Sequence, residues 1–302
     1  MKCLSCGGAL VWFAFAAFQS APAQRVAPIR VVPHDEMSRT PWLREAPATP
    51  QPATSQGTPT VQPEATYYAN VPQQPGPTAP SLPGKLSYNS CTIAGPYIAM
   101  TFDDGPNPQL TPKLLDMLKE RGIKATFFLV GRNVEEYPDI VRRMSAEGHE
   151  VANHSWSHPA LTRLGGESFR KQIENTNDAI VRATGKRPLL MRPPYGATSS
   201  ILNRRLAEEF GLKVILWSVD PLDWKYRNSN RVYSYIIQNT QPGSIILAHD
   251  IHATTVAAMP ATLDSLLGKG YKFVTVSELI AMEVRPQLVK KESSTPAVPV
   301  SQ

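Results

Sequence analysis

The stretch YIAMTFDDGP, residues 97–106, sets two adjacent carboxylates at the end of an apolar run. The run predicts a buried strand, and Gly105-Pro106 predicts that the strand stops there. Because side chains alternate along a strand, Asp103 and Asp104 cannot both point in the same direction. One of them can hold a metal ion while the other stays free to act as a base. Taken alone, the segment is more typical of a polar turn that closes a strand.

Two histidines, His154 and His158, follow a second strand-like segment. Side chains four residues apart can converge on one ion if the residues between them make a helical turn. Pro159 disfavours helix at His158, so we expect a strand-end loop or a single turn. Zinc proteases carry a Glu directly after the first His of such a pair, and Ser155 stands here instead. Together with the two aspartates, the pair supplies three potential metal ligands and one spare carboxylate.

Three further polar clusters lie where apolar runs end. They contain Arg192, the aspartates Asp220 and Asp223, and His249. Each has a simple structural explanation when taken singly: a surface charge, a turn former or a loop histidine. Five such clusters at the carboxyl ends of successive strands indicate more, because barrel enzymes gather their reactive groups on one face of a β/α array. The sequence therefore predicts one site built from all five clusters.

Between these clusters, strand-like and helix-like segments alternate. Thr111-Pro112 predicts a helix start, with Thr111 as the cap and Pro112 at the first helical position. Further helices are expected around residues 140–144 and over residues 167–184, 200–210, 230–238 and 257–267, with strands at 124–130, 214–219 and 272–276. Repeated units of this kind imply parallel strands with helices outside. The periodicity fits a barrel and a doubly wound sheet equally well.

In sequence order, five motifs resemble those of the polysaccharide deacetylase family, carbohydrate esterase family 4. They are TFDDGP at 101–106, HSWSH at 154–158, RPPYG at 192–196, DPLDW at 220–224 and LAH at 247–249. The resemblance covers roughly residues 92–282, without a departure at a position that carries chemistry. It implies an α/β fold, namely a distorted (β/α) barrel of about seven parallel strands that forms a single catalytic domain.

The resemblance also implies a divalent metal ion held by Asp104, His154 and His158. The ion would be Zn²⁺ or another divalent metal such as Co²⁺, Mn²⁺ or Ni²⁺, and two imidazoles with one carboxylate suit a catalytic zinc site. Bound metal lowers the pKa of its water from about 16 toward roughly 7. Asp103 would be the general base that takes a proton from this water. The family, and not the spacing, assigns the two aspartates to their different roles.

A second group of motif residues matches the family's proton-handling machinery. Arg192 matches the arginine that pairs with the base, and a neighbouring guanidinium keeps a carboxylate ionised and aimed. His249 matches the general acid that protonates the leaving amine. Asp223 matches the carboxylate that orients this acid and raises its pKa. It is chosen over Asp220 because it directly precedes the tryptophan of the motif.

Three more motif residues match the family's substrate pocket. The backbone N–H of Tyr195 would join the metal in stabilising the oxyanion, and Trp224 and Leu247 would wall the acetyl pocket. The implied enzyme is a hydrolase of non-peptide C–N bonds that removes N-acetyl groups from N-acetylglucosamine units of peptidoglycan or a chitin-like polysaccharide. An acetylxylan O-deacetylase and a catalytically inactive deacetylase fold that binds glycan are the alternatives.

The ends of the chain differ in composition from the domain. Residues 1–23 are typical of a signal peptide, with an apolar run of about a dozen residues and Ala21-Pro22-Ala23 as the cleavage site. An uncleaved membrane anchor is the alternative, although the run is short for a membrane span. Residues 24–91 are expected as a Pro-rich disordered linker, 92–283 as the catalytic domain and 284–302 as a disordered tail. We therefore expect a secreted protein, extracellular, periplasmic or associated with the cell wall, without stable membrane insertion.

Charge argues against nucleic acid as the partner. Of the formal net charge of +6, about +2 belongs to residues 91–284, because Lys2 contributes one positive charge, residues 24–90 a net one and residues 285–302 a net two. A nucleic-acid-binding domain would carry a basic patch or stripe of its own. We expect an N-acetylated glycan polymer or oligosaccharide as the partner, and a monomeric protein.

Overall fold

The strands form one parallel sheet in the computed structural model, which describes residues 85–284. Its order is β1-β6-β5-β4-β3-β2-β7, and β8 pairs with the start of β2 outside this path. The strands are β1 (Ser87–Tyr88), β2 (Tyr97–Asp103), β3 (Thr126–Leu129), β4 (Glu150–Asn153), β5 (Leu190–Met191), β6 (Lys213–Ile215), β7 (Ile245–His249) and β8 (Lys272–Phe273). The expected signal peptide, nearly all of the linker and nearly all of the tail lie outside the described residues.

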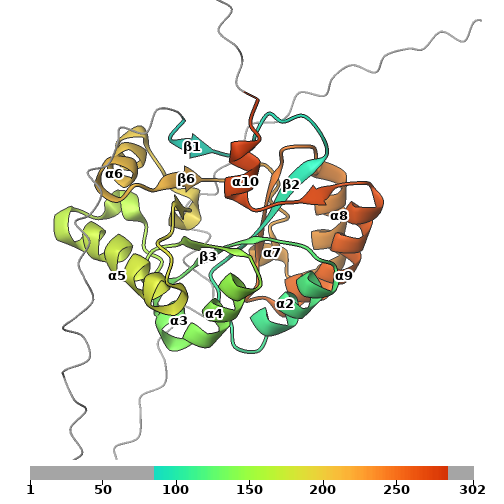
Figure 1. Cartoon of the computed structure of the whole chain (residues 1–302), viewed down its shortest axis with the longest axis horizontal. Helices are drawn as coiled ribbons and strands as arrows, with labels where there is room; N and C mark the ends of the chain where they lie inside the picture. Colours follow the sequence, from blue (N-terminus) through green and yellow to red (C-terminus); the bar gives the residue numbers. More distant parts are fainter. Residues whose placement is uncertain (1–84, 285–302) are drawn as a thin grey trace, which may run out of the picture. The chain divides into compact units, whose positions relative to one another are not determined.

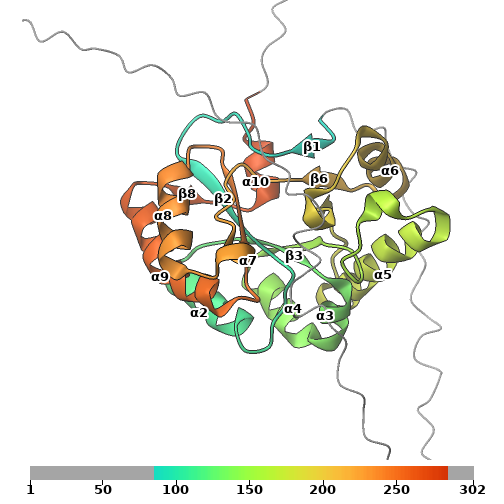
Figure 2. The ribbon, with the colours of Figure 1, turned by 180° about the vertical axis from the view of Figure 1, so that it is seen from behind.

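Helices surround these strands on several sides (Figure 1). They are α2 (Thr111–Glu120), α3 (Gly131–Glu136), α4 (Pro138–Ala146), α5 (Gly166–Thr184), α6 (Ser200–Phe210), α7 (Asp223–Tyr226), α8 (Ser229–Asn239), α9 (Ala253–Gly268) and α10 (Val276–Ala281). Seen from either side, α5 and α6 flank the strands opposite α8 and α9 (Figures 1 and 2). The alternation of strand and helix along the chain therefore gives strands inside and helices outside.

The segment that follows β6 closes the ring of strands. Val219 pairs in parallel with Ile246 of β7, and the N–H of Leu247 donates to the Val219 carbonyl at 2.9 Å. Strands β6, β5, β4, β3, β2 and β7 thus form a closed but irregular circuit, with β1 and β8 added at its margins. The predicted α/β fold, a distorted barrel of parallel strands in a single domain, is confirmed.

Two apolar layers result from the alternation of side chains along the strands. Phe127 belongs to a cluster between the strands and α2, α4 and α9. Its neighbour Phe128 belongs to a second cluster inside the barrel, which includes Ala99 and residues Val276 and Leu279 of α10. Because residues i and i+2 of a strand share a face, Asp103 follows Ala99 toward the barrel interior. The alternation that builds the core therefore also aims this carboxylate inward.

The predicted boundary between linker and domain needs correction. Residues 85–91, expected within the linker, contain β1, which pairs in parallel with β6 at Ser87 and Val214. Tyr88 and Cys91 are buried there. A strand of two residues lacks the length that would reveal alternation, so its order comes from pairing with a distant strand. The short helices α3 and α7 were likewise not predicted.

Three other element boundaries also differ from the sequence prediction. Thr111 does not cap α2, because Leu110 holds the N-cap position and the Thr111 hydroxyl donates to Asp250 instead. The last strand stops at Phe273, and Thr275 begins α10 through a capping box with Glu278. Helix α9 begins at residue 253, four residues before the expected start. A long-range contact decides the first of these boundaries, and a capping box decides the second.

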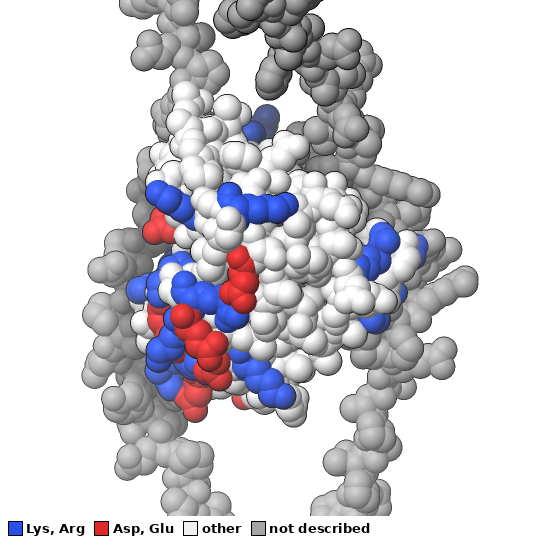
Figure 3. Space-filling view, turned by 90° about the vertical axis from the view of Figure 1, so that its right-hand side faces the viewer, with Lys and Arg blue, Asp and Glu red and all other residues white. Residues whose placement is uncertain are grey.

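Charged side chains of both signs are interspersed on the face seen in Figure 3, beside a broad area without charged residues. On this face of the described domain, Lys and Arg do not form a continuous basic stripe. Among residues 85–284, no helix combines the length and the apolar character that are needed to cross a bilayer.

Candidate active site

Backbone hydrogen bonds at the ends of β2, β4 and β5 position the first site residues. The N–H of Asp104 donates to the Phe128 carbonyl at 3.2 Å, and the N–H of His154 donates to Leu129 at 2.9 Å. The N–H of Arg192 donates in turn to the Asn153 carbonyl at 3.1 Å. Each bond extends the pairing of a strand by one residue, so the side chains emerge at the same end of the barrel.

The turn at Asp104 separates the two adjacent aspartates. Asp103 ends β2 in extended conformation, whereas Asp104 adopts a left-handed backbone with φ of 72°. Such conformations are costly for residues other than glycine and gather at functional sites. Asn133 of α3 fixes the turn by donating its Nδ2 hydrogen to the Asp104 carbonyl at 2.8 Å. The two carboxylates consequently face different partners.

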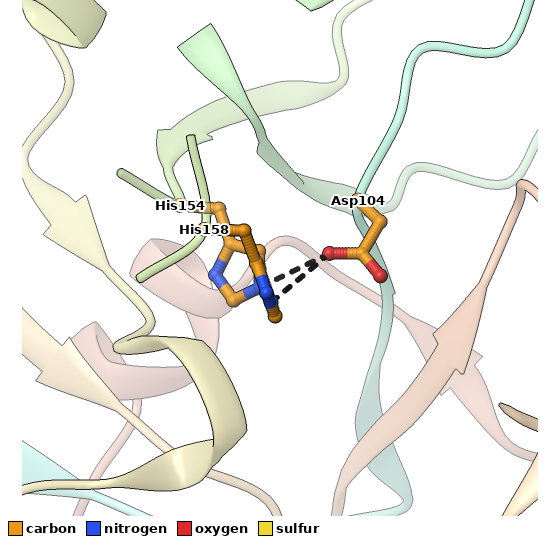
Figure 4. Close-up of side chains that lie close together, drawn as sticks. All are labelled: Asp104, His154 and His158. Carbon is orange, nitrogen blue, oxygen red and sulfur yellow. Dashed lines mark ion pairs between the residues drawn. The ribbon is translucent and has the colours of Figure 1, made fainter. Parts of the chain in front are cut away.

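Asp104, His154 and His158 converge on one point (Figure 4). The Nε2 atoms of both histidines lie 3.4 Å from Asp104 Oδ1, and ligand atoms of the three residues all lie within 4.8 Å of one another. Asp104 Oδ1 is buried and lacks a hydrogen-bond partner among the described residues. Buried polar atoms are normally satisfied, so an orphaned carboxylate oxygen between two imidazoles fits a cation ligand.

Contacts on the side away from Asp104 orient both imidazoles. His154 Nδ1 lies 2.6 Å from the Arg192 carbonyl, which leaves Nε2 facing Asp104. His158 has a left-handed backbone with φ of 61°, and its ring packs edge-on against Tyr195 at 4.6 Å. The segment from His154 to His158 is a loop that follows β4, as Pro159 led us to expect. Burial lowers the pKa of His158 to about 4, which keeps its imidazole neutral and available as a ligand.

The spare carboxylate, Asp103, pairs with a buried arginine. Arg192 Nη1 donates to Asp103 Oδ1 at 2.6 Å and to Thr101 Oγ1 at 2.8 Å. Burial lowers the pKa of Arg192, and the Asp103 carboxylate opposes this effect. The guanidinium also lies 4.1 Å from the ring centroid of Phe128. Asp103 is thereby fixed beside the metal-ligand cluster, with its Oδ2 3.8 Å from His154 Nε2.

A second charge pair joins His249 of the neighbouring strand β7 to Asp223 of α7. His249 sits directly opposite Asp103 in the β2–β7 pairing, and its Nδ1 is 2.8 Å from Asp223 Oδ1. Asp223 is fully buried and also accepts from Thr255 Oγ1 at 2.7 Å and from the N–H of Trp224 at 2.9 Å. Burial lowers the pKa of His249, but the carboxylates of Asp223, Asp104 and Asp103 together raise it to about 10. This imidazole therefore carries a proton at neutral pH.

The three predicted pocket residues lie at the same end of the barrel. Tyr195 adopts a left-handed backbone with φ of 63° in the short 3-10 helix Pro194–Gly196. Leu247 is buried on β7, two residues before His249. Trp224 is half-buried on α7, next to Asp223. The five predicted motifs thus come together as one group of side chains.

Two buried residues near this group were not predicted. His252 lies with its ring 5.7 Å from that of His249, and burial lowers its pKa to about 4. Asp250 is fully buried, and burial raises its pKa to about 7. Their only sequence signal is closeness to His249, because their burial depends on contacts with distant segments.

The domain is similar to proteins that are named as glycan deacetylases. The family model described as polysaccharide deacetylase matches residues 92–215. A peptidoglycan-N-acetylglucosamine deacetylase of Listeria monocytogenes is 48% identical over 182 residues, which are 60% of this chain and 38% of that protein. This chain therefore spans little more than a third of the length of the Listeria protein.

Two further relatives match over most of their own length. A chitooligosaccharide deacetylase of Rhizobium leguminosarum is 38% identical over 61% of this chain and 83% of that protein. The structure of a peptidoglycan deacetylase from Bacillus subtilis superposes with a TM-score of 0.59 at 43% identity, over 64% of this chain and 92% of that one. With the shared fold and the ordered motifs, these matches show that the chain belongs to the polysaccharide deacetylase family.

Proposed function

We propose that the chain is a secreted, metal-dependent hydrolase that removes N-acetyl groups from N-acetylglucosamine units of peptidoglycan or a chitin-like polysaccharide. The observation that carries this proposal is an Asp-His-His cluster at the same end of the barrel as two buried charge pairs, Asp103–Arg192 and His249–Asp223. Amide hydrolysis needs a base for water and an acid for the leaving nitrogen. The two pairs supply one of each.

The metal would be held by Asp104, His154 and His158. The unpartnered Asp104 Oδ1 and the two Nε2 atoms that face it form a donor set suited to Zn²⁺ or another divalent cation such as Co²⁺, Mn²⁺ or Ni²⁺. When bound, such an ion supplies Lewis-acid polarisation of a carbonyl and lowers the pKa of water.

The surrounding side chains account for the proton transfers. Asp103, paired with Arg192, takes a proton from the attacking water. His249 carries a proton at neutral pH and gives it to the amide nitrogen as the carbon–nitrogen bond breaks. The products are acetate and a free amine on the sugar. The N–H of Tyr195 stabilises the oxyanion, while Trp224 and Leu247 enclose the acetyl methyl group.

The proposal includes export and a glycan partner. Residues 1–23 have the composition of a signal peptide, and the relatives act, by their names, on peptidoglycan or chitooligosaccharides. We further propose that the protein is a monomer. The Pro-rich segment ahead of the domain would let the domain reach a polymer outside the cytoplasm. A nucleic-acid partner is not part of the proposal.

Acetate release from a panel of polymers tests this function. The zinc-loaded full chain is incubated with peptidoglycan, chitooligosaccharide and acetylated xylan, and acetate is quantified over time. Release from one of the first two polymers is expected. Release from xylan alone would replace the N-deacetylase with an O-deacetylase, and no release from any polymer with zinc still bound would favour a glycan-binding fold without activity.

A further inference from the structure

Asp250 is a buried carboxyl group that the proposed reaction does not use. It follows His249 at the end of β7 and is fully buried. Its Oδ2 accepts a hydrogen bond from Thr111 Oγ1, and its Oδ1 lacks a partner among residues 85–284. Burying a carboxyl group with one unsatisfied oxygen is costly, so an apolar side chain of similar size would be the cheaper way to fill this space.

Thr111 links Asp250 to the segment that follows the aspartate turn. Its Oγ1 accepts the N–H of Asn107 at 2.8 Å while it donates to Asp250. Asn107 in turn accepts the N–H groups of Gln109 and Leu110 through Oδ1, at 3.0 and 2.9 Å. The chain from β2 to α2 is therefore tied to β7 by one continuous set of hydrogen bonds.

Gly105 packs directly against the Asp250 carboxyl group. A Cβ atom on Gly105 would lie 2.6 Å from both Asp250 Oδ1 and Oδ2, closer than real contacts allow. The backbone of Gly105 is not in the left-handed region, so space and not conformation requires glycine here. Since Gly105 follows the metal ligand Asp104, the carboxyl group of Asp250 sets how closely this turn approaches β7.

We propose that Asp250 is a positioning residue that fixes the Asp104–Gly105 turn against β7 in the geometry that metal binding requires. Two contacts carry this role, the hydrogen bond from Thr111 and the close approach of Gly105. The inference rests on the proposed metal site. It concerns binding of the ion and not a step of the reaction.

The test measures the zinc dissociation constant of the full chain by competition with a chelator. Asp250→Ala is expected to weaken zinc binding by about 10- to 100-fold, the usual effect of losing a residue that orients metal ligands. Asp250→Asn keeps both the volume and an acceptor for Thr111, and should retain most of the affinity. Gly268→Ala, at a helix end with open space around it, is the matched glycine control and should change nothing.

A double-mutant cycle with Gly105 separates positioning from a general loss of stability. Gly105→Ala alone should weaken zinc binding, because its Cβ meets the Asp250 carboxyl group. In the Asp250→Ala background the same substitution should cost much less, since that carboxyl group is gone. Equal effects in both backgrounds would overturn the proposed contact.

Stability of the metal-free variants is measured alongside to show that they fold. If Asp250→Ala does not fold, Thr111→Val takes its place, because it removes the hydrogen-bond donor with little change of volume. Unchanged zinc affinity in a folded Asp250→Ala or Thr111→Val variant would overturn the positioning role alone. A wild-type chain that binds no zinc would instead overturn the proposed metal site, and this inference with it.

Discussion

Asp103 and Asp104 are adjacent and of the same type, but their surroundings differ. The backbone is extended at Asp103 and left-handed at Asp104. Asp103 follows the strand alternation into the barrel and meets Arg192 at 2.6 Å. Asp104 turns away with φ of 72° and faces two imidazoles. The sequence could establish that the two differ, since alternation demands it. It could not assign them, because the partners come from β4 and β5.

Asp103→Asn tests the assignment at the level of this residue. The amide keeps the shape but cannot accept a proton, so turnover should fall by at least about 100-fold. Bound zinc should remain stoichiometric, because Asp103 is not a proposed ligand. Asp178→Asn, an exposed aspartate on α5, is the control and should match wild type. Activity within a few-fold of wild type for Asp103→Asn would contradict the role of base.

Asp223→Asn tests the proposed acid through pH dependence. Asp223, with smaller contributions from Asp104 and Asp103, raises the pKa of His249 to about 10, so the protonated acid persists well above neutral pH. Without the carboxylate, burial lowers this pKa, and His249 loses its proton at lower pH. The alkaline limb of kcat/KM should therefore move to lower pH. Thr255→Val, which removes one hydrogen bond to Asp223 but keeps the charge, should shift it less. If the alkaline limb of kcat/KM stays at the same pH in Asp223→Asn, His249 is not the acid whose titration produces that limb.

At the scale of elements, Arg192 explains why β6 is shorter than predicted. Its Nε donates to the Ile215 carbonyl at 3.2 Å and its Nη2 to the Leu216 carbonyl at 3.0 Å. These side-chain bonds occupy carbonyls that a regular strand would offer to a neighbour. The strand expected over residues 214–219 therefore breaks after Ile215 and resumes at Val219. An apolar run in the sequence cannot reveal an arginine that arrives from another strand.

Arg192→Met should consequently damage both the barrel and the site. It leaves Asp103 buried without its partner, and breaking a buried ion pair in this way costs about 3–5 kcal/mol. Urea unfolding of the metal-free chain measures the loss. Arg187→Lys, at an exposed position before β5, is the control and should have little effect. A loss below about 1 kcal/mol would show that the pair contributes little to the fold.

At the scale of the whole domain, the candidate active site and helix α10 occupy opposite ends of the barrel. Helix α10 places Val276 and Leu279 in the interior cluster, and Glu150 at the start of β4 accepts the N–H of Ser277 at 3.1 Å. The metal-ligand cluster lies beyond the carboxyl ends of the strands. The alternation of strands and helices predicted parallel strands with helices outside, and the family resemblance carried by the ordered motifs predicted the barrel. The two-residue β1 and the start of α10 were beyond prediction, because distant contacts and not local pattern define them.

Leu279→Ala tests this separation of stability from function. Truncating a fully buried leucine costs about 2–5 kcal/mol, so the free energy of unfolding should fall by that amount. Zinc affinity at a temperature where the variant is folded should equal that of wild type. Leu267→Ala, a more exposed leucine on α9, is the control for stability. A folded Leu279→Ala chain with weakened zinc binding would show that the two ends are coupled.

The most direct test of the account is the metal dependence of acetate release from peptidoglycan by the full chain. Activity is measured before chelation, after removal of metal has been verified, and after zinc is restored. We predict loss of release on chelation and recovery with one zinc ion per chain, and no recovery for Asp103→Asn. Undiminished release from a chain shown to be free of metal would contradict the proposed mechanism.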